Sequence, residues 1–94
     1  MEIAELEWDP TNVAKLAAHD IVRREVDDLV NLGLYVVDVH PDYPGQVRIT
    51  GPIRAGRFIT VALELVDEAA GVWRPVTGWD ASEAEEAYYW REHR

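Results

Sequence analysis

Hydrophobic and polar residues alternate most regularly between Gly56 and Leu65. Ile59, Val61, Leu63 and Leu65 share one parity, whereas the residues between them are polar or small. Such alternation, with many β-branched side chains, predicts a strand that is buried on one face. We therefore expect this strand to lie at the centre of a sheet.

A second arm of the same hairpin is predicted at residues 71–79. Residues 66–71 are acidic and end in Gly71, which suits a hairpin loop of about four to six residues. Pro75 has no N–H to donate to a neighbouring strand, so the second arm is expected to be an edge strand or to carry a bulge. The two arms together predict the middle of an antiparallel sheet.

Helix signals flank this hairpin on both sides. Asp9, which precedes a proline, is typical of a helix start, because its carboxylate caps free N–H groups. A second, amphipathic helix is expected to begin after Asp20 as its cap and to stop at Gly33. Ser82 and Glu85 match a capping box, which predicts a C-terminal helix.

The remaining pattern completes the expected architecture. Strands are predicted at residues 2–8, 34–39 and 47–50. The order is then β-α-α-β-β-β-β-α over a single domain, residues 1–94. This order predicts an α+β fold with an antiparallel sheet of about four to five strands, two N-terminal helices and one C-terminal helix, all packed on one face.

The composition affects the expected function more than the expected fold. Eighteen acidic residues oppose nine basic ones, so the formal net charge of the 94-residue chain is −9. A domain this acidic repels nucleic acid unless its arginines gather on one face, and it favours basic partners. The chain has no cysteine, no apolar run of about 20 residues and no basic start typical of a secretory signal. We therefore expect a cytoplasmic protein without disulfides or membrane spans.

Short motifs along the chain resemble, in order, those of BrnT-type toxins. Glu-Trp-Asp-Pro at 7–10 is followed by a histidine at 19 and an aliphatic residue at 21. Later segments that are similar to the family's motifs are Arg-Ile-Thr-Gly at 48–51, Gly-Arg-Phe-Ile-Thr-Val at 56–61, Arg-Pro-Val-Thr at 74–77, and Ala-Ser at 81–82 with Glu86. The resemblance covers nearly the whole chain and rests on the order and spacing of these motifs.

The resemblance implies a RelE-like fold and a ribonuclease toxin that a BrnA-type antitoxin neutralises. Metal-independent RNA cleavage requires a base for the ribose 2′-OH, an acid for the leaving oxygen and cations for the phosphorane charge. The candidates that match the family's motifs are His19, Arg48, Arg57 and Arg74, with Glu86 and Tyr88 of the last helix as helpers.

Each catalytic candidate also has a structural interpretation. Histidine is a common general acid or base, but the position of His19 also suits a helix-end histidine that is bonded to the backbone. The predicted register places Arg48 and Arg74 on one face of the sheet and Arg57 on the opposite parity. All three arginines are equally compatible with ion pairs to the abundant carboxylates.

Aromatic residues near the C-terminus suggest an interface. Trp79, Tyr89 and Trp90 are candidates for contacts with a partner or with a second copy, because aromatic residues are enriched at interfaces. Stacking on RNA bases is the alternative. The run 88–90 spans most of a helical circumference, so at least one of its rings is expected to be exposed.

Other chemistry has little support in the sequence. Asp38, His40 and Asp42 lie close together in the chain but do not have the spacing of a known metal site. There is no phosphate-binding loop and no nucleophile elbow. We therefore expect neither a metal nor another cofactor.

Two functions remain open at this point. The first is a BrnT-like ribonuclease toxin that acts on RNA and binds a BrnA-like antitoxin. The second is a non-catalytic module of the same fold, which binds a basic or amphipathic protein partner or forms a homo-oligomer. Ala18 and Trp79 stand where the family carries a lysine and an arginine, and Asp80 follows where the family is often basic. These positions and the net charge motivate the second function.

Overall fold

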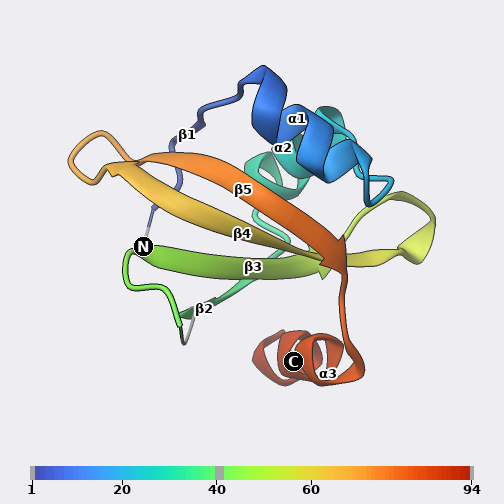
Figure 1. Ribbon diagram of the computed structural model, residues 1–94. Helices are drawn as coiled ribbons and strands as arrows, with labels where there is room; N and C mark the ends of the chain where they lie inside the picture. Colours follow the sequence, from blue (N-terminus) through green and yellow to red (C-terminus); the bar gives the residue numbers. More distant parts are fainter. Residues whose placement is uncertain (1, 40–41, 94) are drawn as a thin grey trace.

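The computed structural model describes residues 2–39 and 42–93, which form one five-stranded sheet and three α-helices (Figure 1). The strands lie in the order β1-β5-β4-β3-β2. The elements are β1 (Glu5–Leu6), α1 (Pro10–Ala17), α2 (Arg23–Asn31), β2 (Val36–Val39), β3 (Gln46–Pro52), a short 3-10 helix (Arg54–Gly56), β4 (Phe58–Asp67), β5 (Val72–Asp80) and α3 (Glu83–Glu92). The α+β fold and the order of elements predicted from the sequence are confirmed.

The hairpin of β4 and β5 lies in the middle of the sheet, as expected. β4 pairs antiparallel with β3 on one side and with β5 on the other. Pro75 lies opposite Leu63, beside a register shift that leaves Val76 without a partner on β4. A bulge therefore accommodates the missing N–H of the proline, while β1 flanks β5 on its outer side.

β1 is shorter than the strand that residues 2–8 predict. Only Glu5 and Leu6 pair with β5, and they run parallel to it, opposite Val72 and Trp73. The sheet is therefore antiparallel apart from this edge pair. α1, which follows β1 directly, also packs against β5.

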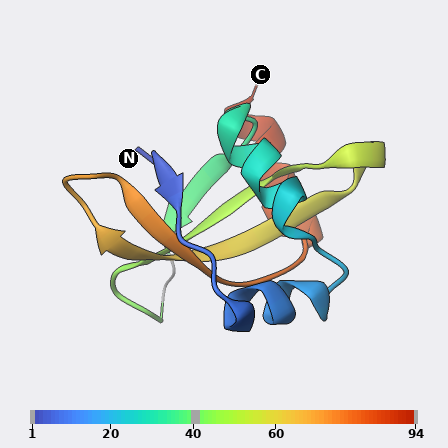
Figure 2. The ribbon, with the colours of Figure 1, turned by 90° about the horizontal axis from the view of Figure 1, so that it is seen from above.

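The helices lie on both faces of the sheet, which corrects the expectation of a single covered face. α1 and α2 lie on one side, and α3 lies on the other (Figure 1 and Figure 2). Alternation along β4 explains this division. Ile59 and Val61 belong to the core with α1 and α2, whereas Thr60 bonds to Thr50, which lines a pocket with α3. The face under α3 is accordingly more polar.

The hydrophobic core lies between the two N-terminal helices and the sheet. Its buried members are each no more than 7% exposed: Leu16, Ile21, Val26, Leu29, Ile49, Ile59, Val61, Leu63 and Trp73. Burial of apolar surface is the main driving force for folding, and a chain of this size has room for one modest core. Among the described residues, no helix is long and apolar enough to cross a lipid bilayer.

The first and last helices begin at the predicted caps. The Asp9 carboxylate accepts the N–H of Asn12 at the start of α1, and the Asn12 side chain accepts the N–H of Asp9 in return. Ser82 and Glu85 form the same reciprocal pair at the start of α3. Both capping predictions are confirmed.

The start of α2 differs from the prediction. Val22 occupies the cap position, and its N–H donates to Oε1 of Glu25 at 3.0 Å. Asp20, the expected cap of this helix, instead adopts a left-handed backbone with φ of 58°. The tight turn between α1 and α2 requires this conformation, and aspartate is one of the few residues apart from glycine that tolerates it.

Candidate functional site

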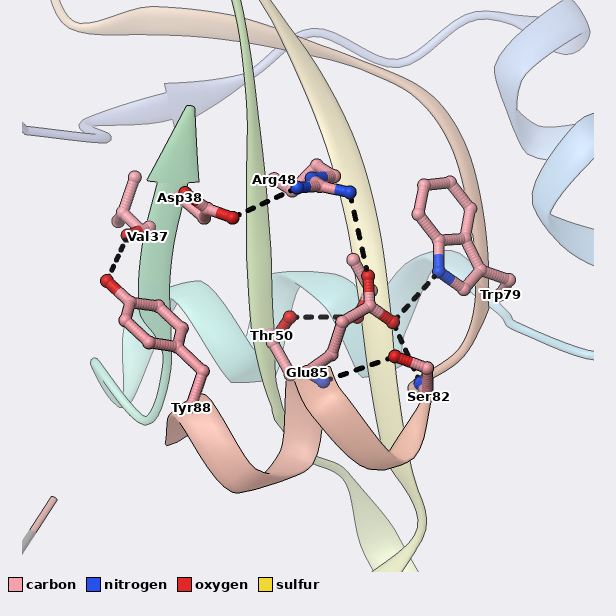
Figure 3. A network of polar contacts seen from close by, with 9 residues as sticks. Val37, Asp38, Arg48, Thr50, Trp79, Ser82, Glu85 and Tyr88 are labelled. Carbon is pink, nitrogen blue, oxygen red and sulfur yellow. Dashed lines mark hydrogen bonds and ion pairs between the residues drawn. The ribbon is translucent and has the colours of Figure 1, made fainter. Parts of the chain in front are cut away.

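A pocket of about 490 Å³ lies between α3 and the polar face of the sheet. Asp38 of β2, Arg48 and Thr50 of β3, and Glu85 and Tyr88 of α3 contribute to its walls (Figure 3). Charged groups of both signs therefore face one another across a small space. The pocket contains two of the predicted catalytic residues, Arg48 and Tyr88.

Arg48 is tied to carboxylates on two sides. Its Nη2 donates to Oδ2 of Asp38 at 2.9 Å, and its Nη1 lies 3.9 Å from Oε2 of Glu85. Asp38 and Arg48 are direct cross-strand partners, so register alone brings them together. The Arg48 side chain is 24% exposed, and its buried Nε finds no acceptor in the described part of the chain. Carboxylates of the same chain thus hold this guanidinium.

Glu85 connects α3 to the sheet. Its Oε1 accepts the backbone N–H of Ser82 at 2.8 Å and the indole N–H of Trp79 at 3.2 Å, while Oε2 faces Arg48. The Ser82 hydroxyl accepts the N–H of Glu85 at 3.1 Å. The glutamate of the capping box therefore has a second role, since it also neutralises Arg48 (Figure 3).

The hydroxyl of Tyr88 forms a hydrogen bond at the edge of the sheet. The hydroxyl donates to the backbone carbonyl of Val37 at 2.9 Å, and β2, which carries Val37, is the outermost strand on this side. The guanidinium of Arg91 lies 5.6 Å from the centroid of the Tyr88 ring. Tyr88 thus covers an edge carbonyl that another strand would otherwise use for pairing.

Arg57 binds the C-terminal end of α1. Its Nη1 donates to the carbonyl of Asp20 at 2.5 Å, and its Nη2 donates to the carbonyl of His19 at 2.8 Å. Its Nε donates to Oδ1 of Asp80 at 2.7 Å. Both carbonyls belong to the turn that follows α1, and a cation near this end of a helix is favoured by the helix dipole. Arg57 therefore links the α1–α2 turn to the adjoining ends of β4 and β5.

Arg74 binds the N-terminal cap of α1. Its Nε and Nη2 donate to Oδ2 of Asp9 at 2.9 Å and 2.5 Å. The N–H of Asn12, with the Arg74 guanidinium as the next cause, holds the pKa of Asp9 below its ordinary value of 3.8. Asp9 therefore stays ionised at neutral pH and neutralises Arg74.

The three arginines occupy three separate places. Arg74 and Arg57 bind opposite ends of α1, whose eight residues span about 12 Å. Arg48 lies under α3. Cross-strand pairing assigns Arg74 and Arg48 to the same face of the sheet, but the guanidinium of Arg74 contacts Asp9 beside the first helix. No shared arginine patch forms among these three residues.

The other two catalytic candidates stand apart from the pocket network. His19 follows α1 with an exposed side chain, and it meets Arg57 through its backbone carbonyl. Its imidazole makes no hydrogen bond to the residues that the structure describes. Glu86 is half-buried on α3 and does not line the pocket. The pairs that the fold does bring together are Arg48 with Tyr88, and Arg57 with His19.

The predicted interface aromatics differ in exposure. Trp90 is 56% exposed, whereas Tyr89 is 6% exposed and packs edge-on against Phe58 with ring centroids 5.1 Å apart. Trp79 is half-buried, and its indole N–H is used by Glu85. Of the three candidates, Trp90 therefore offers the largest fraction of its side chain to a partner.

The sequence alone does not reveal that the carboxylates of Asp38 and Glu85 contact Arg48. The sequence presents Asp38 only as a metal ligand, and His40, its companion in that hypothesis, lies outside the described residues. It presents Glu85 only as part of a helix cap. The signal for Asp38 is the opposite charge of Asp38 and Arg48 on neighbouring strands, which becomes visible once their register is known.

Comparison with known proteins adds no assignment: no protein-family model matches this chain, and no curated protein matches it. The functional proposal therefore rests on the geometry and charge of the chain itself.

Proposed function

We propose that this protein is a non-catalytic, BrnT-like binding module that takes a basic or amphipathic protein partner, such as a BrnA-like antitoxin, in the cytoplasm. One observation carries the proposal. Each arginine expected to hold phosphate is paired with a carboxylate of the same chain: Arg48 with Asp38, Arg57 with Asp80, and Arg74 with Asp9.

These pairs weaken the case for an RNA substrate. A phosphate would have to displace a carboxylate that is already in contact with the guanidinium, and it would approach a chain of net charge −9. Nucleic-acid affinity depends mainly on cations that neutralise phosphates and release counterions. Paired cations at three separate places do not provide a continuous track for an RNA backbone.

The same charge distribution favours a basic protein. A strongly acidic surface attracts a basic partner over a distance and suppresses binding of acidic ones. The exposed side chain of Trp90 on α3 adds apolar area of the kind that is enriched at interfaces. A protein partner thus accounts for features that an RNA substrate leaves unexplained.

The test is an RNA-cleavage assay with the purified chain at low salt, combined with growth of cells that express it. We expect intact single-stranded RNA, and we expect Arg48→Ala, Arg74→Ala and the control Arg24→Ala to behave alike. The Arg24 side chain is 81% exposed, so the control removes one positive charge at the surface.

Cleavage of RNA by the wild-type chain would overturn the proposal if Arg48→Ala or Arg74→Ala abolished it while Arg24→Ala retained it. That pattern would assign the chain to ribonuclease toxins.

A further inference from the structure

A small apolar groove lies between α2 and the connection from β3 to β4. It encloses about 210 Å³, and its apolar walls are Leu29, Leu32, Leu34, Pro52 and Ile53. Leu29 is 2% exposed and belongs to the core, whereas Leu32 and Leu34 are 68% and 41% exposed. The groove therefore connects the edge of the core to the surface, and it shares no lining residue with the pocket under α3.

The C-terminal end of α2 shapes this groove. Gly33 has φ of 66°, and its N–H donates to the carbonyl of Val30 at 3.1 Å. The N–H of Leu34 donates to the carbonyl of Leu29 at 3.3 Å. Together these two bonds form the Schellman motif, which the helix stop predicted at Gly33 anticipates. The motif folds Leu34 back toward Leu29 and leaves Leu32 exposed at the helix end.

Gly51 on β3 lets this turn lie directly on the sheet. A Cβ atom at this position would lie 2.0 Å from the carbonyl oxygen of Leu34 and 2.7 Å from Cδ1 of Leu29. Any other residue would push the turn outward. The walls of the groove are thus fixed by backbone geometry, and a preformed groove loses less conformational entropy when a partner binds.

Charged residues surround the apolar walls. Glu25 and Asp28 of α2 stand on one side, and Arg54 stands on the other. The Asp28 carboxylate is 56% exposed, and its ion pair with Arg24 is long at 3.9 Å. An exposed pair of this kind contributes little, so Asp28 can exchange it for another cation at small cost. With two acids and one base, these charged residues around the groove have a net negative charge, like the whole chain.

We infer that this groove receives an apolar side chain from a basic amphipathic helix of the partner, whose Lys or Arg residues face Asp28 and Glu25. The inference rests on the proposed function and names the surface that performs it. The groove is smaller than the roughly 300–1,000 Å³ of small-molecule sites, but it matches the insertion of single apolar side chains in helix-in-groove recognition.

The experiment uses the full chain and a synthetic helical peptide of leucine and lysine, about 20 residues long, because isolated helices shorter than about 12–15 residues are marginal in water. The same peptide with glutamate in place of lysine is the charge control. Binding is followed by fluorescence anisotropy and by two-dimensional NMR of the labelled chain. The variants are Leu32→Ser and Asp28→Lys, with Val39→Ser as the matched control, because Val39 is 70% exposed on β2 and does not line the groove.

We expect the lysine peptide to bind and the glutamate peptide not to bind, with NMR shifts at Leu29, Leu34 and Ile53. Leu32→Ser should weaken binding about tenfold or more, equivalent to about 1.4 kcal/mol. Asp28→Lys should also weaken binding of the lysine peptide, and Val39→Ser should leave this binding unchanged. All three positions are more than half exposed, so the variants are expected to remain folded.

Other outcomes separate the groove from the proposed function. If the lysine peptide still binds the Leu32→Ser variant and the NMR shifts lie elsewhere, the groove is not the binding site. That result would overturn this inference but would still support a basic partner. Absence of peptide binding, together with RNA cleavage by the wild-type chain, would overturn both. Dimerisation of the wild-type chain that Leu32→Ser abolishes would identify a second copy as the occupant and would also overturn the inference.

Discussion

Arg48 and Asp38 stand opposite each other on β3 and β2, and the guanidinium donates to the carboxylate at 2.9 Å. Glu85 approaches the same guanidinium from α3. An arginine that the motif pattern assigns to phosphate binding is thus held by two acids of its own chain. If these acids are what keep the site from binding RNA, their removal should restore some affinity.

The double variant Asp38→Asn/Glu85→Gln is expected to bind single-stranded RNA more tightly than the wild-type chain. Both substitutions keep the shape of the side chain, and a glutamine in place of Glu85 can still act in the helix cap. One freed cation should steepen the slope of log K against log salt by about 0.7, the value for one phosphate contact in a single strand. Fluorescence anisotropy with a labelled RNA at several salt concentrations measures this slope.

The control removes the same number of charges elsewhere. Glu68→Gln/Glu83→Gln changes two exposed acids that form no ion pair among the described residues. An equal gain in RNA affinity by both double variants would mean that net charge, and not the release of Arg48, determines the effect.

Tyr88 contributes to stability through its hydroxyl. Tyr88→Phe removes the bond to the Val37 carbonyl and should lower the free energy of unfolding by about 1 kcal/mol. Tyr35→Phe is the matched control, because the hydroxyl of Tyr35 forms no hydrogen bond to the described residues. Tyr35 is also partly buried, and this burial raises its pKa. Urea denaturation checks both variants, and equal losses would show that the Val37 bond contributes nothing.

The left-handed backbone at Asp20 predicts an asymmetry between two substitutions. Asp20→Gly and Asp20→Ala both remove the carboxylate, but alanine also meets the steric cost of positive φ, roughly 1–2 kcal/mol. The glycine variant should therefore be about 1 kcal/mol more stable than the alanine variant and no less stable than the wild-type chain. Thermal denaturation compares them, and a more stable alanine variant would contradict this account of the turn.

The pKa of Asp9 predicts how stability depends on pH. Because this pKa is lowered in the folded chain, the unfolded chain binds more protons in the acidic range. The resulting stabilisation is fully present above the ordinary value of 3.8 and is lost as the pH falls through the folded pKa. Asp9→Asn retains a capping side chain, so its difference from the wild-type chain should be largest at neutral pH and should shrink in acid. A pH-independent difference between the two would contradict the assignment.

Local patterns predict most of the fold because they depend on near neighbours in the sequence. The alternation along β4 identifies the apolar face that joins the core, although Thr60 and Ala62 on the other face are buried as well. The caps at Asp9 and Ser82 are satisfied within three residues. The position of α3 is not predictable in this way. Its buried side is formed by Tyr89 and its polar contacts by Glu85, so its sequence shows no clear apolar stripe.

The candidate site is less predictable because its contacts are non-local. Arg74 meets Asp9 across 65 positions of the chain, and Arg57 meets the His19 carbonyl across 38. Neither contact follows from periodicity. Arg48 and Asp38 are only ten positions apart, but their pairing depends on strand register, which a shift of one residue would reverse. The sequence identified the arginines, and the structure identified their partners.

The most direct test of the central claim is the affinity of the wild-type chain for a labelled single-stranded RNA, measured from about 50 mM to about 200 mM salt. If the three arginines are neutralised by Asp38, Asp80 and Asp9, binding should be weak throughout and should change little with salt. Tight binding that falls steeply over this range would show that the arginines contact phosphate, and it would contradict the account.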